Sequence, residues 1–232
     1  MKKYLARGFA VDEGRCIKAK KIEAVLLDFL CNGHDSLSGK TIADIGCGSG
    51  HIAAYFSAGN QVWAADVIDQ VTDTVRDNIH FLKIEHDTLP FSEEKFDIAI
   101  LNHVIAHTMN KSKLLSETYR ILKRGGLCYI ANPNWFYPVE PYYHVPLLHY
   151  LPEYVFLKLS KYLGKNIENV YLISCLSLKK IAERAGFKVY DFTVRVINDP
   201  GKYFSEFRAP LGVRLPETAS VISPTNIFIL KK

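Results

Sequence analysis

Apolar positions along the chain follow two spacings, one typical of helices and one typical of strands. The helical spacing first predicts an amphipathic helix that ends near Gly33 and buries Ile22, Val25, Leu26, Phe29 and Leu30. Short apolar runs predict five strands, at 41–45, 61–67, 81–85, 96–101 and 127–132. Helical patterns lie between these runs, at 52–56, around Val71 and Val75, and at 114–122, with Gly125-Gly126 closing the last helix. Strands and helices therefore alternate through the first 132 residues.

The same alternation returns near the end of the chain. A helix is predicted at 177–185, with Ser177 as its N-cap and Gly186 as its C-terminal stop. Two further strands are predicted at 188–197 and 225–232. Strands separated by helices indicate parallel pairing with crossovers. The sequence thus predicts an α/β, doubly wound, mostly parallel seven-stranded sheet in a single domain, 1–232.

Residues 133–175 interrupt this alternation. Prolines and aromatic residues crowd the stretch, among them Pro138, Pro141, Trp135, Tyr142 and Tyr143. We interpret it as a proline-rich, aromatic cap inserted after the fifth strand, within the single domain. Its aromatic side chains either form a small core of their own or line an apolar pocket for a substrate, and the two readings are compatible.

Composition narrows the functional classes. No window approaches the ~18 uninterrupted apolar residues of a membrane span, and the first residues lack the apolar core of a signal peptide. The five cysteines are scattered without CxxC spacing, which argues against disulfides or zinc and fits a reducing cytoplasm. The net charge of +5 is modest and forms no basic stripe, so no nucleic-acid partner is expected. Weak attraction to anionic substrates or to a membrane surface stays open, and the oligomeric state is not indicated.

Three alternate glycines follow the first predicted strand, in the stretch TIADIGCGSG at 41–50. Glycine tolerates positive φ and lets another group approach the backbone closely. A dinucleotide fingerprint, GxGxxG, would need glycine where His51 stands. Asp66 ends the second predicted strand, where a carboxylate can accept hydrogen bonds from both hydroxyls of a ribose. The combination indicates a cofactor with a ribose and without a pyrophosphate.

These motifs, in this order, resemble those of the class I S-adenosylmethionine-dependent methyltransferases. The resemblance is good over 40–132 and looser over 177–187. It includes LPFSEEKFDIAIL at 89–101 and ETYRILKRGG at 117–126, where Arg124 replaces the usual proline. The resemblance implies a Rossmann-like methyltransferase fold with S-adenosylmethionine as the cofactor.

The resemblance also implies roles for individual residues. Gly46 and Gly48, with Cys47 between them, would carry the methionyl and ribose parts of the cofactor, and Asp44 would orient that loop. Asp66 would hold the ribose, beside Val67 and Ile68, of which Ile68 would cover the adenine. Either Glu85 or Asp87 would meet the adenine amino group, and Asn102 and His103 would face the methyl-donor end. Cys47 is read as a small filler rather than a nucleophile.

Three histidines are candidates for a catalytic base. His103 and His107 are four residues apart and would share a face if a helical turn follows the fourth strand; no third ligand with zinc spacing is evident. His144 lies in the predicted cap. A base is needed if the acceptor is a hydroxyl, and less so if it is a carbanion or an amine. Asp97 and the pair Glu117 and Arg120 are read as structural.

The function predicted is methyl transfer to a small, largely apolar acceptor, lipid-like or quinone-like. Methylation of a saccharide or an RNA nucleoside is the alternative among enzymes. A catalytically inactive cofactor-binding protein with a regulatory or assembly role is the alternative from another class. A dehydrogenase is disfavoured because the third glycine of its fingerprint is missing.

Overall fold

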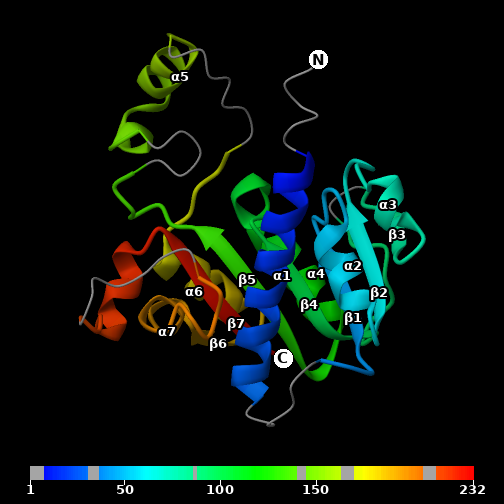
Figure 1. Cartoon of the computed structure of the whole chain (residues 1–232). Helices are drawn as coiled ribbons and strands as arrows, with labels where there is room; N and C mark the ends of the chain where they lie inside the picture. Colours follow the sequence, from blue (N-terminus) through cyan, green and yellow to red (C-terminus); the bar gives the residue numbers. More distant parts are fainter. Residues whose placement is uncertain (1–7, 31–36, 86–87, 140–144, 163–169, 206–212) are drawn as a thin grey trace.

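The predicted strands assemble into one sheet, seen in a computed structural model (Figure 1). The structure describes residues 8–30, 37–85, 88–139, 145–162, 170–205 and 213–232. The strands are β1 (Thr41–Ile45), β2 (Gln61–Asp66), β3 (His80–Lys83), β4 (Phe96–Asn102), β5 (Leu122–Pro133), β6 (Lys188–Asp191) and β7 (Thr225–Lys231). Their order is β3-β2-β1-β4-β5-β7-β6, and β7 runs antiparallel to both its neighbours. The mostly parallel, seven-stranded prediction is confirmed.

Helices cover both faces of the sheet. They are α1 (Gly8–Leu30), α2 (His51–Ser57), α3 (Asp73–Arg76), α4 (Lys111–Ile121), α5 (Glu153–Tyr162), α6 (Cys175–Arg184) and α7 (Thr193–Asn198), with 3-10 turns η2 (Ile105–His107), η3 (Leu148–Tyr150) and η4 (Glu217–Ile222). Because side chains alternate along a strand, β4 sends Ile98 to one face and Ala99 to the other. The first face packs against α1, α2 and α7, and the second against α4 and α6.

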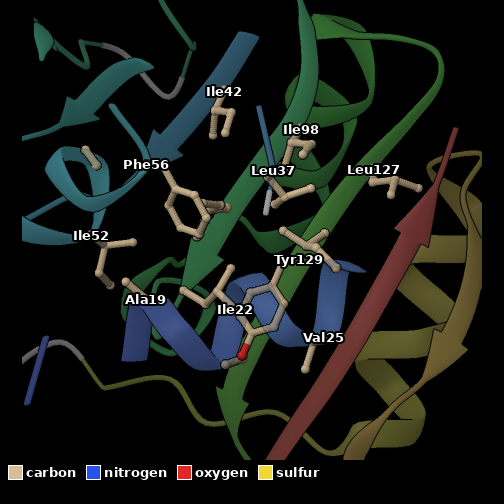
Figure 2. Packing of buried hydrophobic residues seen from close by; sticks show 14 of the residues in the cluster. Ala19, Ile22, Val25, Leu37, Ile42, Ile52, Phe56, Ile98, Leu127 and Tyr129 are labelled. Carbon is tan, nitrogen blue, oxygen red and sulfur yellow. The ribbon is translucent and has the colours of Figure 1, made fainter. Parts of the chain in front are cut away.

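The first face forms the core shown in Figure 2. Ala19, Ile22 and Val25 of α1 lie against Tyr129 of β5, whose ring is almost fully buried. This packing holds α1 along the sheet, with the N-terminal part of the helix reaching past the strands (Figure 1). The carboxyl ends of the strands therefore have α1 beside them.

Three sequence-based element boundaries were wrong. The predicted strand at 188–197 is β6 followed by α7, because the Asp191 carboxylate accepts a hydrogen bond from the Thr193 amide and starts a helix. The N-cap of α6 is Ser174, not Ser177: its hydroxyl accepts from the Ser177 amide. The glycine pair at 125–126 does not close α4 but lies inside β5, where the register against β4 is irregular.

Two predicted structural acids do hold elements together. Asp97 accepts a hydrogen bond from the amide of Thr41, at 2.8 Å, and forms an ion pair with Lys123. Glu117 pairs with Arg120 and accepts from the amide of Leu89, so that α4 is tied to the segment before β4. Both acids lie outside the site described below.

Beyond β5 the chain leaves the sheet. Asn134 is fully buried there: its side-chain amide donates to the carbonyls of Val221 and Ser223 and accepts from the amides of Phe136 and Cys175. Farther along, Trp135 and Tyr150 stack edge to face. Figure 1 shows α5 standing apart from the sheet, on the side of the strands' carboxyl ends.

Candidate active site

Two cavities open where β1, β2, β4 and β5 end. The first, of about 300 Å³, is lined by Ile45, Gly46, Asp66, Val67, Ile84, Leu89, His103, Val104, His107, Thr108, Asn110 and Leu114. The second, of about 290 Å³, is lined by Lys18, Lys21, Asn102, His103, Tyr129, Ala131, Pro133, Tyr137, Val139, Thr193, Val196, Ile197, Ser205, Pro224, Thr225 and Ile227. His103 is common to both linings, so one side chain forms part of the wall of each cavity.

The glycine loop after β1 borders the first cavity. Gly46, Gly48 and Gly50 all have positive φ, of 72°, 51° and 82°. A Cβ on Gly46 would lie 2.5 Å from the Val104 side chain, and one on Gly50 would touch Ile79. A Cβ on Gly48 would meet no atom within 4 Å. Two of the glycines are therefore required for packing within the protein, and Gly48 leaves open space for a ligand.

Asp66 fastens this loop to the end of β2. One carboxylate oxygen accepts a hydrogen bond from the Gly48 amide at 2.8 Å, and the other accepts from the Val67 amide at 2.7 Å. Carboxylate oxygens have two lone pairs each, which leaves acceptor capacity toward the cavity. Val67 and Ile68 follow as exposed apolar side chains, at 60% and 58% exposure. This arrangement fits a ribose on the carboxylate with a flat apolar ring beside it.

Asp44 lies almost fully buried under the same loop, with 2% of its surface exposed. Its Oδ2 atom has no hydrogen-bond partner among the described residues. Burial, together with the nearby charge of Asp66, raises the pKa of the Asp44 carboxyl to about 7, although Arg15 and the Ala53 amide oppose the shift. An unsatisfied acceptor at this place fits a ligand that brings a hydrogen-bond donor to the loop, as the methionyl ammonium of S-adenosylmethionine would.

His103 follows β4 in a left-handed conformation, with φ of 63°, which is uncommon for a residue with a side chain. Its amide donates to the carbonyl of Ala131, which fixes the strained residue against β5. Burial lowers the pKa of its imidazole to about 4, with further lowering from Lys18, Lys21, Arg15 and His107. The imidazole is therefore neutral near pH 7 and can accept a proton.

The other predicted residues divide between the two cavities and their surroundings. His107 lines the first cavity and is exposed, and Asn102 lines the second. His103 and His107 both line the first cavity, and the 3-10 turn η2 brings them there, not one face of an α-helix. Cys47 is buried, its amide donates to the Ala65 carbonyl, and burial raises the pKa of its thiol. That environment suits a small filler and not a nucleophile.

Glu85, Asp87 and His144 are not placed at either cavity or at the glycine loop. Glu85 is exposed and bridges to Thr88, and its neighbour Ile84 lines the first cavity in its place. Asp87 and His144 lie outside the described residues. Among the residues described, no group of three His, Cys, Asp or Glu side chains could hold a metal ion. No described helix has both the length and the apolar composition needed to cross a membrane.

Sequence reasoning missed most of the second cavity. Lys18 and Lys21 of α1 and Thr193 of α7 were not singled out, and α7 itself was taken for a strand. One signal was available: Lys18 and Lys21 are three residues apart on a helix that also carries an apolar stripe, Ile22, Val25 and Leu26. Spacing of that kind is also found on ordinary solvent-facing helices, so the signal was weak.

Known proteins resemble the chain in the region of this site. Residues 43–130 match a family model described as a methyltransferase domain. The "ubiquinone/menaquinone biosynthesis C-methyltransferase UbiE" of Vibrio vulnificus is 27% identical over 138 residues, 53% of this chain and 52% of that protein. The chain thus spans about half the length of that curated relative.

Solved structures share the fold at low identity. A Thermotoga maritima protein described as a possible histamine N-methyltransferase superposes with a TM-score of 0.59 at 18% identity, covering 100% of this chain and 96% of that one. Phosphoethanolamine N-methyltransferase 2 of Haemonchus contortus, solved with S-adenosyl-L-methionine, gives a TM-score of 0.54 at 18% identity, covering 88% and 51%. Residues 43–130 thus match a methyltransferase domain, and the seven-stranded sheet of the chain has the fold of these methyltransferase structures.

Proposed function

We propose that the protein transfers a methyl group from S-adenosylmethionine, bound in the first cavity, to a small acceptor bound in the second. The observation that carries the proposal is the shared wall: His103 lines both cavities, so a donor in one and an acceptor in the other would meet beside it. A relative named as a ubiquinone/menaquinone biosynthesis C-methyltransferase supports an acceptor with an apolar, quinone-like ring. The scattered free cysteines favour the cytoplasm as the place of action.

The cofactor would supply an electrophilic methyl group on a sulfonium. For that group to react, the protein has to hold the acceptor atom in line with it, close to ~3 Å away. Asp66 would hold the ribose through its free lone pairs, and Gly48 would leave room for the cofactor against the backbone. Asp44 would accept a hydrogen bond at its otherwise unsatisfied oxygen.

His103 is the residue that we propose as general base. Its imidazole is neutral near pH 7 and stands between the cavities; because the lowered pKa makes it a weak base, it would take the proton of an acceptor hydroxyl as the oxygen bonds to the methyl group and the hydroxyl becomes acidic. His107 reaches the first cavity and is exposed, which suits a shaping role more than proton transfer.

Two measurements test the proposal. Calorimetry should detect binding of S-adenosylhomocysteine and none of NAD, since the loop lacks the dinucleotide fingerprint. Incubation with methyl-labelled cofactor, at a concentration below saturation, and cell extract should then give labelled product with the native protein and much less with Asp66→Ala. Binding without any labelled product would instead support the alternative of a cofactor-binding protein without catalysis.

A further inference from the structure

A buried hydroxyl group lines the second cavity without a hydrogen-bond partner in the protein. Tyr129 of β5 has 1% of its surface exposed, and it forms part of the cavity wall. No described residue forms a hydrogen bond with its hydroxyl group. Burial raises the pKa of Tyr129, so the phenol is protonated at neutral pH and can donate. Buried tyrosine hydroxyls usually have a partner, because an unsatisfied polar group in the interior costs free energy.

The other polar groups of the described wall differ from Tyr129 in this respect. The Thr193 hydroxyl accepts a hydrogen bond from the amide of Ile227 at 3.0 Å. Interactions with other groups are also made by Lys18, Lys21 and Ser205. The remaining polar residues of the wall are half-buried: Asn102, Tyr137 and Thr225. The hydroxyl of Tyr129 is therefore the deeply buried polar group of this wall that is left for a ligand.

Tyr129 and His103 lie at different depths of the same cavity. In Figure 2 the phenol oxygen points away from Leu127, in the direction in which β5 runs. Two residues farther along β5, on the same face, lies Ala131, whose carbonyl accepts the hydrogen bond from the His103 amide. The side chain of Ala131 is a single methyl group, which leaves room beside it. A molecule in the cavity would thus have the phenol at its inner end and His103 at the end where the strands finish.

We propose that Tyr129 selects the acceptor by donating a hydrogen bond to an oxygen atom on the acceptor's ring, while the reacting atom faces His103. This inference rests on the proposed function and narrows its acceptor to an oxygenated ring, as opposed to a hydrocarbon ring or a lipid chain. The wall around the phenol is apolar, with Ala131, Val196 and Ile227 all buried. A pocket built to hydrogen-bond a ligand rejects the analogue that lacks the matching group, because the polar group of the pocket is then left unpaired.

A pair of probes of equal shape tests the inference. Acetophenone carries a carbonyl oxygen where α-methylstyrene carries a methylene group. Each is titrated by ligand-observed NMR into the native protein and into Tyr129→Phe, with and without saturating S-adenosylhomocysteine. Tyr129→Phe should weaken the binding of acetophenone about three- to tenfold, the factor for one hydrogen bond, and should not weaken that of α-methylstyrene. Comparing the two proteins for each probe cancels the difference in hydration between the probes.

Tyr119→Phe is the matched control. Tyr119 lies on α4, on the other face of the sheet, where its ring packs 5.0 Å from that of Phe187, and it is not part of the described cavity wall. Its replacement should leave both affinities unchanged. Thermal unfolding adds a second measurement: because the Tyr129 hydroxyl has no partner in the ligand-free protein, Tyr129→Phe should keep or raise the unfolding temperature.

The outcomes separate this inference from the proposed function. An equal effect of Tyr129→Phe on the two probes, an effect of Tyr119→Phe as large, or a fall in the unfolding temperature of Tyr129→Phe would overturn the role of Tyr129 even if S-adenosylhomocysteine binds. Weakening of acetophenone alone by Tyr129→Phe, in a protein that fails to bind S-adenosylhomocysteine, would leave the oxygen-binding site standing and remove the methyltransferase proposal.

Discussion

A glycine loop with a constrained backbone borders the first cavity, whereas side chains of separate elements enclose the second. The loop of three glycines with positive φ borders the first, and the Gly48 amide is tied to Asp66. The second is enclosed by side chains from α1, β5, β7 and α7, four elements that come from both ends of the chain. The two share a neighbour in His103 and differ in nearly every other respect.

This difference separates what the fold fixes from what can change. A loop with positive φ and close internal contacts accepts few residues other than glycine, so a cavity of that kind persists with its sequence motif. A cavity lined by side chains can change its shape and charge one substitution at a time while the sheet stays intact. Such a division would let one cofactor site serve many acceptors.

The largest effect is expected at Gly46. Valine there would be held at φ near 72° and pressed against Val104, so we expect unfolding to become easier by about 3–5 kcal/mol, with loss of cofactor binding. Gly48→Ala should cost only about 1 kcal/mol of stability, because its Cβ meets no atom, yet weaken cofactor binding.

Urea unfolding and calorimetry of the two variants measure both quantities. Gly14→Ala on α1 is the control, since it meets no atom within 4 Å and should stabilise the helix by up to ~1 kcal/mol. Equal destabilisation by Gly46→Val and Gly48→Ala would contradict the distinction between a packing glycine and a ligand-facing one.

Asp44 should make the stability of the cofactor-free protein depend on pH. Its carboxyl has a pKa of about 7 in the fold, against an ordinary value of 3.8, so the folded state binds its proton more tightly than the unfolded state does. The free energy of unfolding should therefore fall as the pH rises from about 4 to about 7, by on the order of 4 kcal/mol from this group. Asp44→Asn should remove that part of the slope in urea titrations at pH 4.5, 5.5 and 7. An identical pH dependence in the variant would show that the Asp44 carboxyl does not have a raised pKa in the folded protein.

Asp66→Ala should weaken cofactor binding by ~1.5–3 kcal/mol, the range for hydrogen bonds to a charged group. The fold should survive, because Asp66 is half-exposed at the end of β2. Asp69→Asn is the matched control: that acid lies three residues on and pairs with Arg76 at the surface. Calorimetry with S-adenosylhomocysteine compares the two, and a folded Asp66→Ala protein with native affinity would remove Asp66 from the site.

The smallest effect on the cofactor side is expected from removing the predicted cap. Asn134 and Ile173 bridge to each other, so the ends of the segment between them lie side by side. A short Gly/Ser linker replacing residues 138–170 should leave S-adenosylhomocysteine affinity within about tenfold, ~1.4 kcal/mol. Transfer to the natural acceptor should be lost, since the segment supplies Val139 to the second cavity. Retained transfer would make the segment merely structural.

The sequence was informative where the backbone demands particular residues. Because positive φ favours glycine, the backbone conformation at Gly46 and Gly48 is visible in the sequence. The loop and Asp66 could therefore be predicted from the spacing of these residues. Most of the strands were found because buried strands are short apolar runs. The run at 188–197 was misread since a short apolar run has no clear period; the hydrogen bond from the Thr193 amide to the Asp191 carboxylate marks the turn at which the helix begins.

The second cavity was beyond the reach of pattern analysis for a different reason. Tyr129 and Ala131 are typical strand residues, and Lys18 and Lys21 are typical of a helix edge; nothing in their spacing joins them. They meet because α1 packs across β5, a contact between residues more than a hundred positions apart. Reasoning from sequence placed the acceptor pocket in the cap, whereas among the described residues the second cavity takes only Pro133, Tyr137 and Val139 from that segment.

The position of His103 in both linings has a thermodynamic consequence. If a ligand in one cavity shifts this strained residue or changes its protonation, the affinity of the other cavity changes with it. Such coupling is reciprocal: the factor by which the cofactor alters acceptor affinity equals the factor by which the acceptor alters cofactor affinity. One backbone torsion would then make binding cooperative, because whichever ligand settles His103 first prepares the site for the other.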